Sequence, residues 1–357
     1  MKRVWLLGLL CLGGLGVAVA FSVSSREAST EQTSVGEVSQ KGSRSDGEQA
    51  VISIPLGGPF ANRESEISGL AWWGDRLILL PQYPERMGGQ IFALDKSKVV
   101  DWLTAQKSGQ VTSPLFPDAI ALEDGTLPAD IDGFEGYEAI AFRNQTAFLT
   151  IESETAAGAL GYIVSGSLNE AGTQLTINPD FRAEVRPQSD SPNKSEETLL
   201  LAEAQIISIY EVNGAQLNPN PVAHSFNTSL TPTAPIPFPS VEYRLTDATA
   251  LDQQNRFWAI NYFYPGDRDL NVEQDPLAAR YGQGATHQDN EQVERLIEFE
   301  YAPSGITITD TAPIQLALED DARNWEGIAR LDEQGFLLVT DKFPETILGF
   351  VEIDKED

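Results

Sequence analysis

The sequence contains very little cysteine and histidine, and this excludes several classes of protein. Its 357 residues include one cysteine, Cys11, and two histidines, His224 and His287. A disulfide framework is impossible with one cysteine, so stability has to come from core packing, with bound ions as a further source. A zinc site made of His and Cys side chains would have too few ligands in this chain.

Positive charge is scarce as well. The chain has 24 Lys and Arg against 53 Asp and Glu, a formal net charge of −29. Such a chain repels phosphate backbones, which excludes nucleic-acid binding as a primary role. Anionic membrane surfaces are disfavoured for the same reason. Divalent cations are the natural partners of so acidic a protein.

The N-terminus has the pattern of a secretory signal peptide. Lys2 and Arg3 precede an apolar run from Val4 to Ala20, which ends in small residues. This predicts a signal peptide over residues 1–20 and export to the periplasm or the extracellular space, with no membrane span after cleavage. An uncleaved anchor is the alternative, because the run is only slightly shorter than the roughly 20 residues that span a bilayer. Lipid attachment at Cys11 is a further alternative.

The next segment differs in composition from the rest of the chain. Residues 21–50 consist mostly of Ser, Glu, Gln, Gly and Thr. Such a stretch cannot bury enough apolar surface to offset its ordering entropy, so a flexible polar linker is expected there. Residues 51–357 remain as the folded domain.

A short pattern recurs five times along that domain. A polar or acidic residue is followed by a small residue, an apolar residue and usually Ala. A polar turn and a second apolar run follow each copy, which is typical of a β-hairpin. The copies are Ser68-Gly69-Leu70-Ala71, Glu138-Ala139-Ile140-Ala141, Glu197-Thr198-Leu199-Leu200, Asp247-Ala248-Thr249-Ala250 and Glu326-Gly327-Ile328-Ala329.

The carboxylates of these copies are regularly spaced. In four copies an acid opens the first strand, and an acid or amide follows 14 or 15 residues later, at the end of the second strand. The pairs are Glu138 and Glu152, Glu197 and Glu211, Asp247 and Asn261, and Glu326 and Asp341. The first copy has Ser68 and Gln82 at these positions. Asp118 opens a similar short pattern, but no hairpin follows it.

The hairpins predict an all-β fold. Third strands are expected after most of them, and no long segment has the 3.6-residue period of a helix. Repeated hairpins at intervals of 50 to 79 residues predict a single β-propeller of five or six four-stranded blades. The strand at Val51–Pro55 is expected to close the last blade. A β-sandwich, or a pair of them, is the alternative fold.

The repeat units resemble the phytase-like family of β-propellers, also described as having the esterase-like activity of phytase. The resemblance rests on Glu326-Gly327-Ile328-Ala329 with Phe336–Asp341, and on the parallel segments at Glu138 and Glu197. It covers roughly residues 60–355 and extends more distantly to the gluconolactonase and regucalcin propellers. In these families, inner-strand carboxylates hold divalent metal in or near the central channel. The resemblance therefore implies Ca²⁺ ligands at Glu138, Glu197, Asp247 and Glu326, and a second set at Glu152, Glu211, Asn261 and Asp341.

Two interpretations of these carboxylates remain open. Because the first strand of each blade lines the channel, the acids would converge, repel one another and raise their own pKa values. A bound Ca²⁺ would relieve this repulsion, and could serve the hydrolysis of a phosphoester or carboxylic ester. Alternatively, each acid accepts backbone N–H groups from a neighbouring blade. The protein would then be a non-catalytic binding or scaffold module with a protein partner.

Other candidate residues give weaker indications. His224 and His287 lie in polar stretches, and no Gly-x-Ser-x-Gly nucleophile motif is present, so no catalytic residue is assigned. The tryptophans in or beside the repeat strands, Trp72, Trp73, Trp258 and Trp325, are expected either to pack between blades or to stack on a flat ligand such as a sugar. Two polar segments, 178–195 and 262–290, are expected as long loops, the second a candidate lid.

Overall fold

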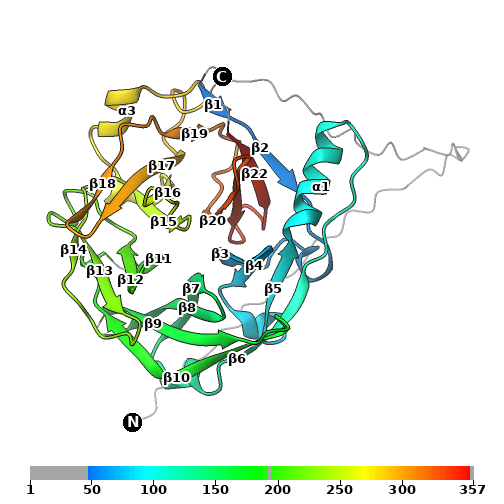
Figure 1. Cartoon of the computed structure of the whole chain (residues 1–357). Helices are drawn as coiled ribbons and strands as arrows, with labels where there is room; N and C mark the ends of the chain where they lie inside the picture. Colours follow the sequence, from blue (N-terminus) through cyan, green and yellow to red (C-terminus); the bar gives the residue numbers. More distant parts are fainter. Residues whose placement is uncertain (1–46, 157, 192–193, 354–357) are drawn as a thin grey trace, which may run out of the picture. The chain divides into compact units, whose positions relative to one another are not determined.

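The computed structural model describes residues 47–156, 158–191 and 194–353. The expected signal peptide and residues 21–46 of the expected linker lie outside the described residues. The described chain consists mainly of β-strands, which confirms the all-β class (Figure 1). None of its helices is long and apolar enough to cross a membrane.

The first two copies of the repeat form one eight-stranded sheet. Each contributes four consecutive antiparallel strands, and the two outermost strands, β6 and β10, pair in parallel. The strands of the first copy are β3 (Ile67–Trp73), β4 (Arg76–Pro81), β5 (Gln90–Asp95) and β6 (Asp118–Glu123). Those of the second are β7 (Phe134–Arg143), β8 (Thr146–Thr155), β9 (Gly158–Leu168) and β10 (Gln174–Val185).

The other three copies each start a separate sheet. The third has β11 (Glu196–Ala202), β12 (Gln205–Tyr210), β13 (Val222–Asn227) and β14 (Ile236–Pro237). The fourth has β15 (Arg244–Ala248), β16 (Arg256–Phe263), β17 (Val293–Ala302), β18 (Gly305–Ile308) and β19 (Ile314–Leu316), with β1 (Glu48–Gln49) parallel to β19. The fifth has β20 (Trp325–Leu331), β21 (Gly335–Thr340) and β22 (Leu348–Glu352), and β2 (Val51–Ile54) pairs antiparallel with β22.

The first strands of the five copies surround a common axis (Figure 1). They contact one another in the order β3, β7, β11, β15, β20, and β20 contacts β3. This radial arrangement of sheets is a β-propeller. The hydrophobic core lies between neighbouring sheets: one cluster, for example, joins Leu77 and Phe92 of the first copy to Leu337 and Phe350 of the fifth.

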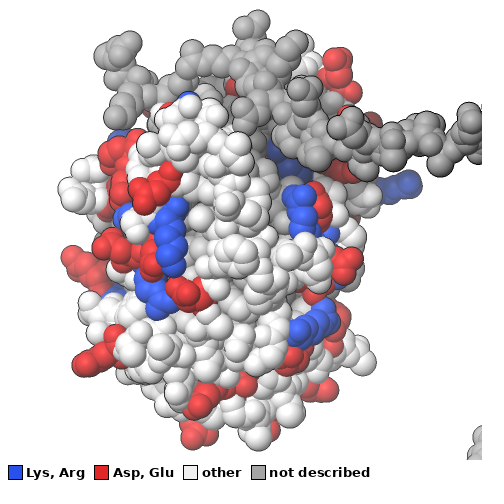
Figure 2. All heavy atoms as spheres, turned by 90° about the vertical axis from the view of Figure 1, so that its right-hand side faces the viewer, with Lys and Arg blue, Asp and Glu red and all other residues white. Residues whose placement is uncertain are grey.

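Short helices connect some of the strands. They are α1 (Lys96–Lys107), α2 (Leu127–Asp130) and α3 (Pro276–Tyr281), with 3₁₀ turns η1 (Gly58–Phe60), η2 (Pro84–Met87) and η3 (Arg268–Leu270). The sequence pattern did not indicate α1. Its buried apolar residues are Val99, Trp102 and Leu103, a stripe too short to establish a helical period. On the face that carries α1, Lys and Arg side chains lie among Asp and Glu (Figure 2), as in the Lys98–Asp95 pair at 3.0 Å.

Three segments differ from the sequence expectation. Residues 178–195 were expected to form a loop, but β10 continues to Val185. The strand register shifts between Asn178 and Arg182, around Pro179, which has no N–H to donate, and pairing then resumes. Within the expected linker, Glu48 is buried in β1. The expected loop 262–290 contains η3 and α3.

The small second residue of the repeat permits close approach of the inner strands. A Cβ atom on Gly69 would lie 3.1 Å from the carbonyl oxygen of Glu138 in the neighbouring strand. A Cβ atom on Gly327 would lie 2.7 Å from Val339 Cγ2 and 3.0 Å from the backbone of Gly69. Hydroxyl groups add links across the same boundaries, since Ser68 Oγ donates to the Tyr137 carbonyl at 2.6 Å.

Replacing Gly327 with valine should therefore destabilise the fold. The added side chain has no room between β20 and β3, and overpacking of this kind costs about 1–3 kcal/mol. Urea denaturation should show a lower unfolding midpoint. Ala250→Val is the matched control, because Ala250 is an exposed small residue of another copy and should tolerate the change. Equal midpoints for the two variants would contradict a packing role for Gly327.

Candidate functional site: a carboxylate cluster at one end of the channel

Acidic side chains gather at the end of the channel where the inner strands begin. We use the name carboxylate cluster for six acids and the two cationic side chains among them. Charge interactions connect its members, and its glutamates are each 9% exposed or less. The cluster consists of Glu138, Glu152, Glu197, Glu211, Glu326, Asp341, Arg244 and Lys194.

Arg244, at the start of β15, is the residue that joins the cluster together. Its Nε donates a hydrogen bond to Glu211, and its Nη2 lies 3.5 Å from Glu197 Oε1 and 3.3 Å from Glu326 Oε1. Lys194 Nζ lies 3.7 Å from the same Glu211 oxygen that Arg244 contacts. Neither cation was predicted from the sequence. The one sequence feature that could have pointed to Arg244 is its position, three residues before the fourth copy of the repeat.

Amide side chains support two of the glutamates. Gln82 Nε2 donates to Glu138 Oε1 at 2.9 Å, and Asn324 Nδ2 donates to Glu326 Oε1 at 2.5 Å. Gln82 occupies the closing position of the first copy, where the other copies carry an acid or Asn. The first copy thus contributes an amide to the cluster through Gln82, while Ser68 binds the neighbouring strand.

The cluster contains more carboxyl groups than cationic side chains. Its six carboxyl groups face two cationic side chains. Burial and then the charge of Glu211 raise the pKa of Glu152 to about 7. Burial raises the pKa of Glu326 to about 8, although Arg244 acts in the opposite direction. Burial also raises the pKa of Glu138 and that of Glu197 well above the usual range. The charge of Glu152 adds to this effect at Glu138, and the charge of Glu211 adds to it at Glu197.

Several oxygen atoms of this region have no partner. Glu152 Oε1, Glu197 Oε2 and Glu211 Oε2 are buried and accept no hydrogen bond, and the same holds for Ser195 Oγ and Thr198 Oγ1 close by in sequence. A buried acceptor without a partner is costly, so each such atom requires an explanation.

These oxygens have the chemistry that Ca²⁺ prefers. Nevertheless, no three His, Cys, Asp or Glu side chains in the described parts of the chain are arranged as a metal site. The side chains instead place the guanidinium of Arg244 among Glu197, Glu211 and Glu326. The donor set therefore fits the ion chemically, but binding would require these side chains to shift around Arg244.

Two of the sequence-predicted ligands have other partners. The carboxylate of Asp247 accepts the N–H of Ile328 at 2.9 Å and also those of Leu70 and Ala248. It thereby links β15 to β20 and β3. This is the backbone-linking role that the sequence left open as the alternative to metal binding. Asn261 donates to the Arg244 carbonyl at 3.1 Å and accepts from Arg295 Nε at 2.8 Å. Asn261 thus supports the backbone of Arg244.

The remaining candidates lie outside the cluster. His224 Nδ1 is 3.1 Å from Glu196 Oε1, and His287 Nδ1 is 2.7 Å from Glu48 Oε1. Trp258 and Trp325 are buried in the core between sheets, where they pack. Trp72 and Trp73 are only half-buried.

The raised pKa values predict that stability falls as pH rises. Glu152 and Glu326 keep their protons in the folded state up to about pH 7 and 8, whereas in the unfolded chain they lose them near 4.5. Between these pH values the folded state thus binds more protons than the unfolded chain. The contribution of these protons to folding stability is lost as pH increases through about 7 and 8. Thermal melts of the metal-free protein should give a higher midpoint at the acidic end of the window.

A double variant tests whether the cluster causes this slope. His224 would contribute in the same direction, because the interaction with Glu196 outweighs burial and raises the pKa of His224. Glu152→Gln/Glu326→Gln should flatten the dependence on pH, while His224→Gln should leave most of it. An unchanged slope in the double variant would contradict the assignment.

Comparison with known proteins gives a likeness of fold only. No protein-family model matches the sequence, and no curated protein is similar enough to be a relative. Among solved structures, a bifunctional GH43-CE protein of Bacteroides eggerthii has a TM-score of 0.48 and 11% identity. The match covers 86% of this chain and 35% of that protein, so the chain spans about a third of its length.

Two further structures match over nearly their whole length. An exo-1,5-alpha-L-arabinanase from a bovine ruminal metagenomic library has a TM-score of 0.44 and 10% identity, over 84% of this chain and 97% of the enzyme. A family 117 glycoside hydrolase of Zobellia galactanivorans has a TM-score of 0.42 and 7% identity, over 88% and 94%.

Proposed function

We propose that the carboxylate cluster binds a divalent cation, with Ca²⁺ as the first candidate, in an exported phytase-like propeller that hydrolyses a phosphoester or carboxylic ester. One observation carries this proposal. Glu152, Glu197 and Glu211 each present a buried carboxylate oxygen with no partner, and Arg244 and Lys194 neutralise only part of the surrounding charge. A cation bound there would satisfy these atoms and relieve their repulsion.

The proposal includes a closed ring of five blades. Each of the five hairpin copies would be one blade, and β2 would be the outermost strand of the last, because it pairs with β22. This closure would connect the two ends of the domain and hold the five inner strands at a fixed distance from the axis. A rigid ring of this kind keeps carboxylates from different blades close together despite their repulsion.

The residues of the cluster have separable roles in this mechanism. Glu152, Glu197 and Glu211 would hold the ion, which when bound would polarise a substrate oxygen and acidify a water. Glu326, which lies beside Arg244 in the same cluster, would be the proton donor to a leaving oxygen. Arg244 contacts Glu197 and Glu326 at 3.3 to 3.5 Å, long for charge-assisted bonds, so an anionic substrate can compete for it.

Thermal melts with Ca²⁺ and with a chelator test the ion site directly. Ca²⁺ at about 100 times its dissociation constant adds roughly 2.7 kcal/mol, which raises the midpoint by about 5 °C. Glu197→Gln should lose this rise, whereas Glu333→Gln, an exposed acid in a turn, should retain it. A midpoint that Ca²⁺ leaves unchanged would contradict the proposal. If Ca²⁺ raises the melting midpoint of the parent protein, assays with chromogenic esters and phosphoesters are justified.

A non-catalytic binding module is the second candidate function. It is favoured by the observation that Arg244 already lies among three of the carboxylates, so that the cluster can serve as an internal ion-pair network. In that case the melt shows no effect of Ca²⁺, and ligand binding has to occur elsewhere on the propeller.

A further inference from the structure

A large cavity opens at the end of the channel opposite the carboxylate cluster. Its volume is about 850 Å³, and residues from all five inner strands or their turns line it. The floor is formed by Leu70, Ile140, Leu199 and Ile328, each 5% exposed or less. Each of these four residues follows the first residue of a repeat copy by two positions, which places it further along the inner strand.

This channel-mouth cavity is separated from the carboxylate cluster. The Asp247 carboxylate lies between them and accepts the N–H groups of Leu70 and Ile328, two residues of the cavity floor. Ligands at the two ends of the channel would therefore not share contacts.

A half-buried aromatic groove extends from the cavity. An adjoining hollow of about 490 Å³ shares Trp72 and Phe142 with the cavity and continues past Trp73 and Asn144, between the first two hairpin turns. The Trp72 ring is held in place, because its Nε1 donates to the Arg330 carbonyl at 2.7 Å. Preorganised rings of this kind can stack on a flat apolar surface without loss of side-chain entropy.

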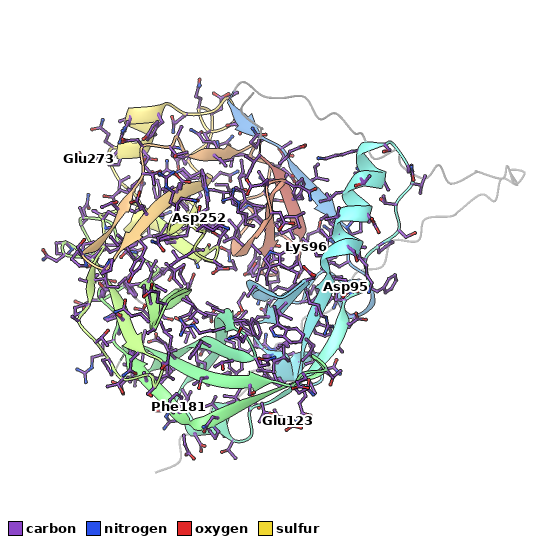
Figure 3. All side chains as sticks on the ribbon, viewed as in Figure 1. Asp95, Lys96, Glu123, Phe181, Asp252 and Glu273 are labelled. Atoms are coloured by element: carbon purple, nitrogen blue, oxygen red, sulfur yellow. The ribbon has the colours of Figure 1, made fainter. Side chains whose placement is uncertain are left out.

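The charges around the cavity are already paired. Lys96 Nζ lies 2.9 Å from Asp332, and Arg330 Nη2 lies 3.1 Å from Glu333 and its Nη1 4.0 Å from Asp252. Lys96 and Asp252, both labelled in Figure 3, lie around the central opening. With these cations engaged, the rim offers little attraction to a phosphate or carboxylate ligand.

Neutral polar groups are available instead. The side-chain amides of Asn144, Gln145, Gln253 and Gln254 line the cavity or groove and form no hydrogen bond with another described residue. Amides both donate and accept, which suits hydroxyl groups. These features match a neutral sugar chain. The aromatic rings can stack on the apolar faces of sugar residues, the free amides can bond to their hydroxyl groups, and the paired charges do not favour an anionic ligand.

We propose that the channel-mouth cavity and its aromatic groove bind a neutral oligosaccharide or polysaccharide. Sugar rings would stack on Trp72 and Trp73, and hydroxyl groups would bond to the amides of the turns at Asn144 and Gln253. The site is distinct from the carboxylate cluster, so sugar binding is independent of Ca²⁺. Either proposal can fail without the other.

Affinity electrophoresis of the full chain in the presence of a chelator tests this proposal. Soluble xylan, arabinan, mixed-linkage β-glucan and galactomannan are the neutral probes, and polygalacturonate is the anionic one. At least one neutral polysaccharide should retard the protein, and polygalacturonate should not. Trp72→Ala should weaken that retardation at least tenfold. Tyr264→Ala, which removes an exposed ring outside the cavity, should leave it unchanged.

A second variant distinguishes a loss of binding from a loss of folding. Loss of the Trp72 hydrogen bond can disturb the fold, whereas Asn144 and Gln145 are exposed turn residues. Asn144 has a positive φ of 55°, which Gly also adopts, so replacement of Asn144 by Gly and of Gln145 by Ala should change the melting midpoint little. The Asn144→Gly/Gln145→Ala variant should also bind more weakly. Absence of retardation by every neutral probe overturns the proposal, as does unchanged retardation of both variants. Binding of 1-naphthol without any polysaccharide would assign the cavity to an apolar ligand and overturn it too.

Discussion

Replacing Arg244 with leucine is expected to lower the free energy of unfolding by about 3 to 5 kcal/mol near pH 9, where Glu326 is ionised in the parent. The guanidinium contacts Glu197, Glu211 and Glu326, all of them buried. Without it, these carboxylates retain their repulsion and their desolvation but lose their main opposite charge. Urea denaturation of the parent and of Arg244→Leu measures the loss.

The dependence of that loss on pH distinguishes electrostatics from packing. Burial already raises the pKa of Glu326 and of Glu197, and removal of the cation raises both further. Glu326 and Glu197 hold their protons near pH 5 with or without the cation, so the difference from the parent should be smaller there than near pH 9. Arg244→Lys should recover part of the stability at both pH values. A loss that is the same at both would indicate that Arg244 acts through its packing.

An exposed arginine provides the reference for these measurements. Arg256 is 44% exposed and lies 3.8 Å from Glu298 and from Glu300 on β17. Ion pairs of this type contribute about 0–1 kcal/mol. Arg256→Leu should therefore change the unfolding free energy far less than Arg244→Leu does.

The strands were predictable because their signals are local. An apolar run, a polar turn and a second apolar run within about 15 residues define each hairpin. Because the signals are local, the full length of β10 was not predicted. Pro179 interrupts the pattern, but the pairing with β9 resumes at Arg182, where tertiary contacts outweigh the local signal. In α1, only Val99, Trp102 and Leu103 are buried, so its periodicity was too short to detect.

The partners of the acids were not predictable in the same way. Arg244 lies 33 residues from Glu211 and 82 from Glu326 in the chain, and no spacing rule relates a cation to acids of other sheets. Equivalent positions on several strands were predictable from the sequence, but which charges would meet in the cluster was not. Scarcity of basic residues indicated a metal ion as the counter-charge, whereas the structure places one of the few arginines there.

Side-chain length separates the two interpretations of the repeat acid. Asp247 has the shorter side chain, and its carboxylate remains beside the backbone, where it accepts N–H groups from β20 and β3. Glu138, Glu197 and Glu326 are one methylene longer, and charge interactions connect their carboxylates within the cluster. The same position of the repeat therefore links strands in one copy and supplies charge to the channel in others.

Replacing Arg323 with methionine is the second change with a large expected effect. Arg323 is 2% exposed and Glu294 is fully buried, and the two side chains meet between the fourth and fifth sheets, with Nη2 and Oε2 2.7 Å apart. Arg323 Nη2 also donates to the Ala317 carbonyl at 2.7 Å, and Trp325 Nε1 donates to Glu294 at 2.7 Å. The variant would leave the Glu294 carboxylate buried without its cation, at a cost of about 3–5 kcal/mol.

A double-mutant cycle shows whether that cost arises from the unpaired charge. Arg323→Met/Glu294→Leu removes both charges and should be more stable than Arg323→Met alone, because no unpaired carboxylate remains in the core. Arg280→Met is the control, since Arg280 pairs with Asp310 at 2.7 Å on the exposed surface and its replacement should change stability far less. If Arg323→Met unfolds at the same urea concentration as Arg280→Met, the buried pair does not hold these two sheets together.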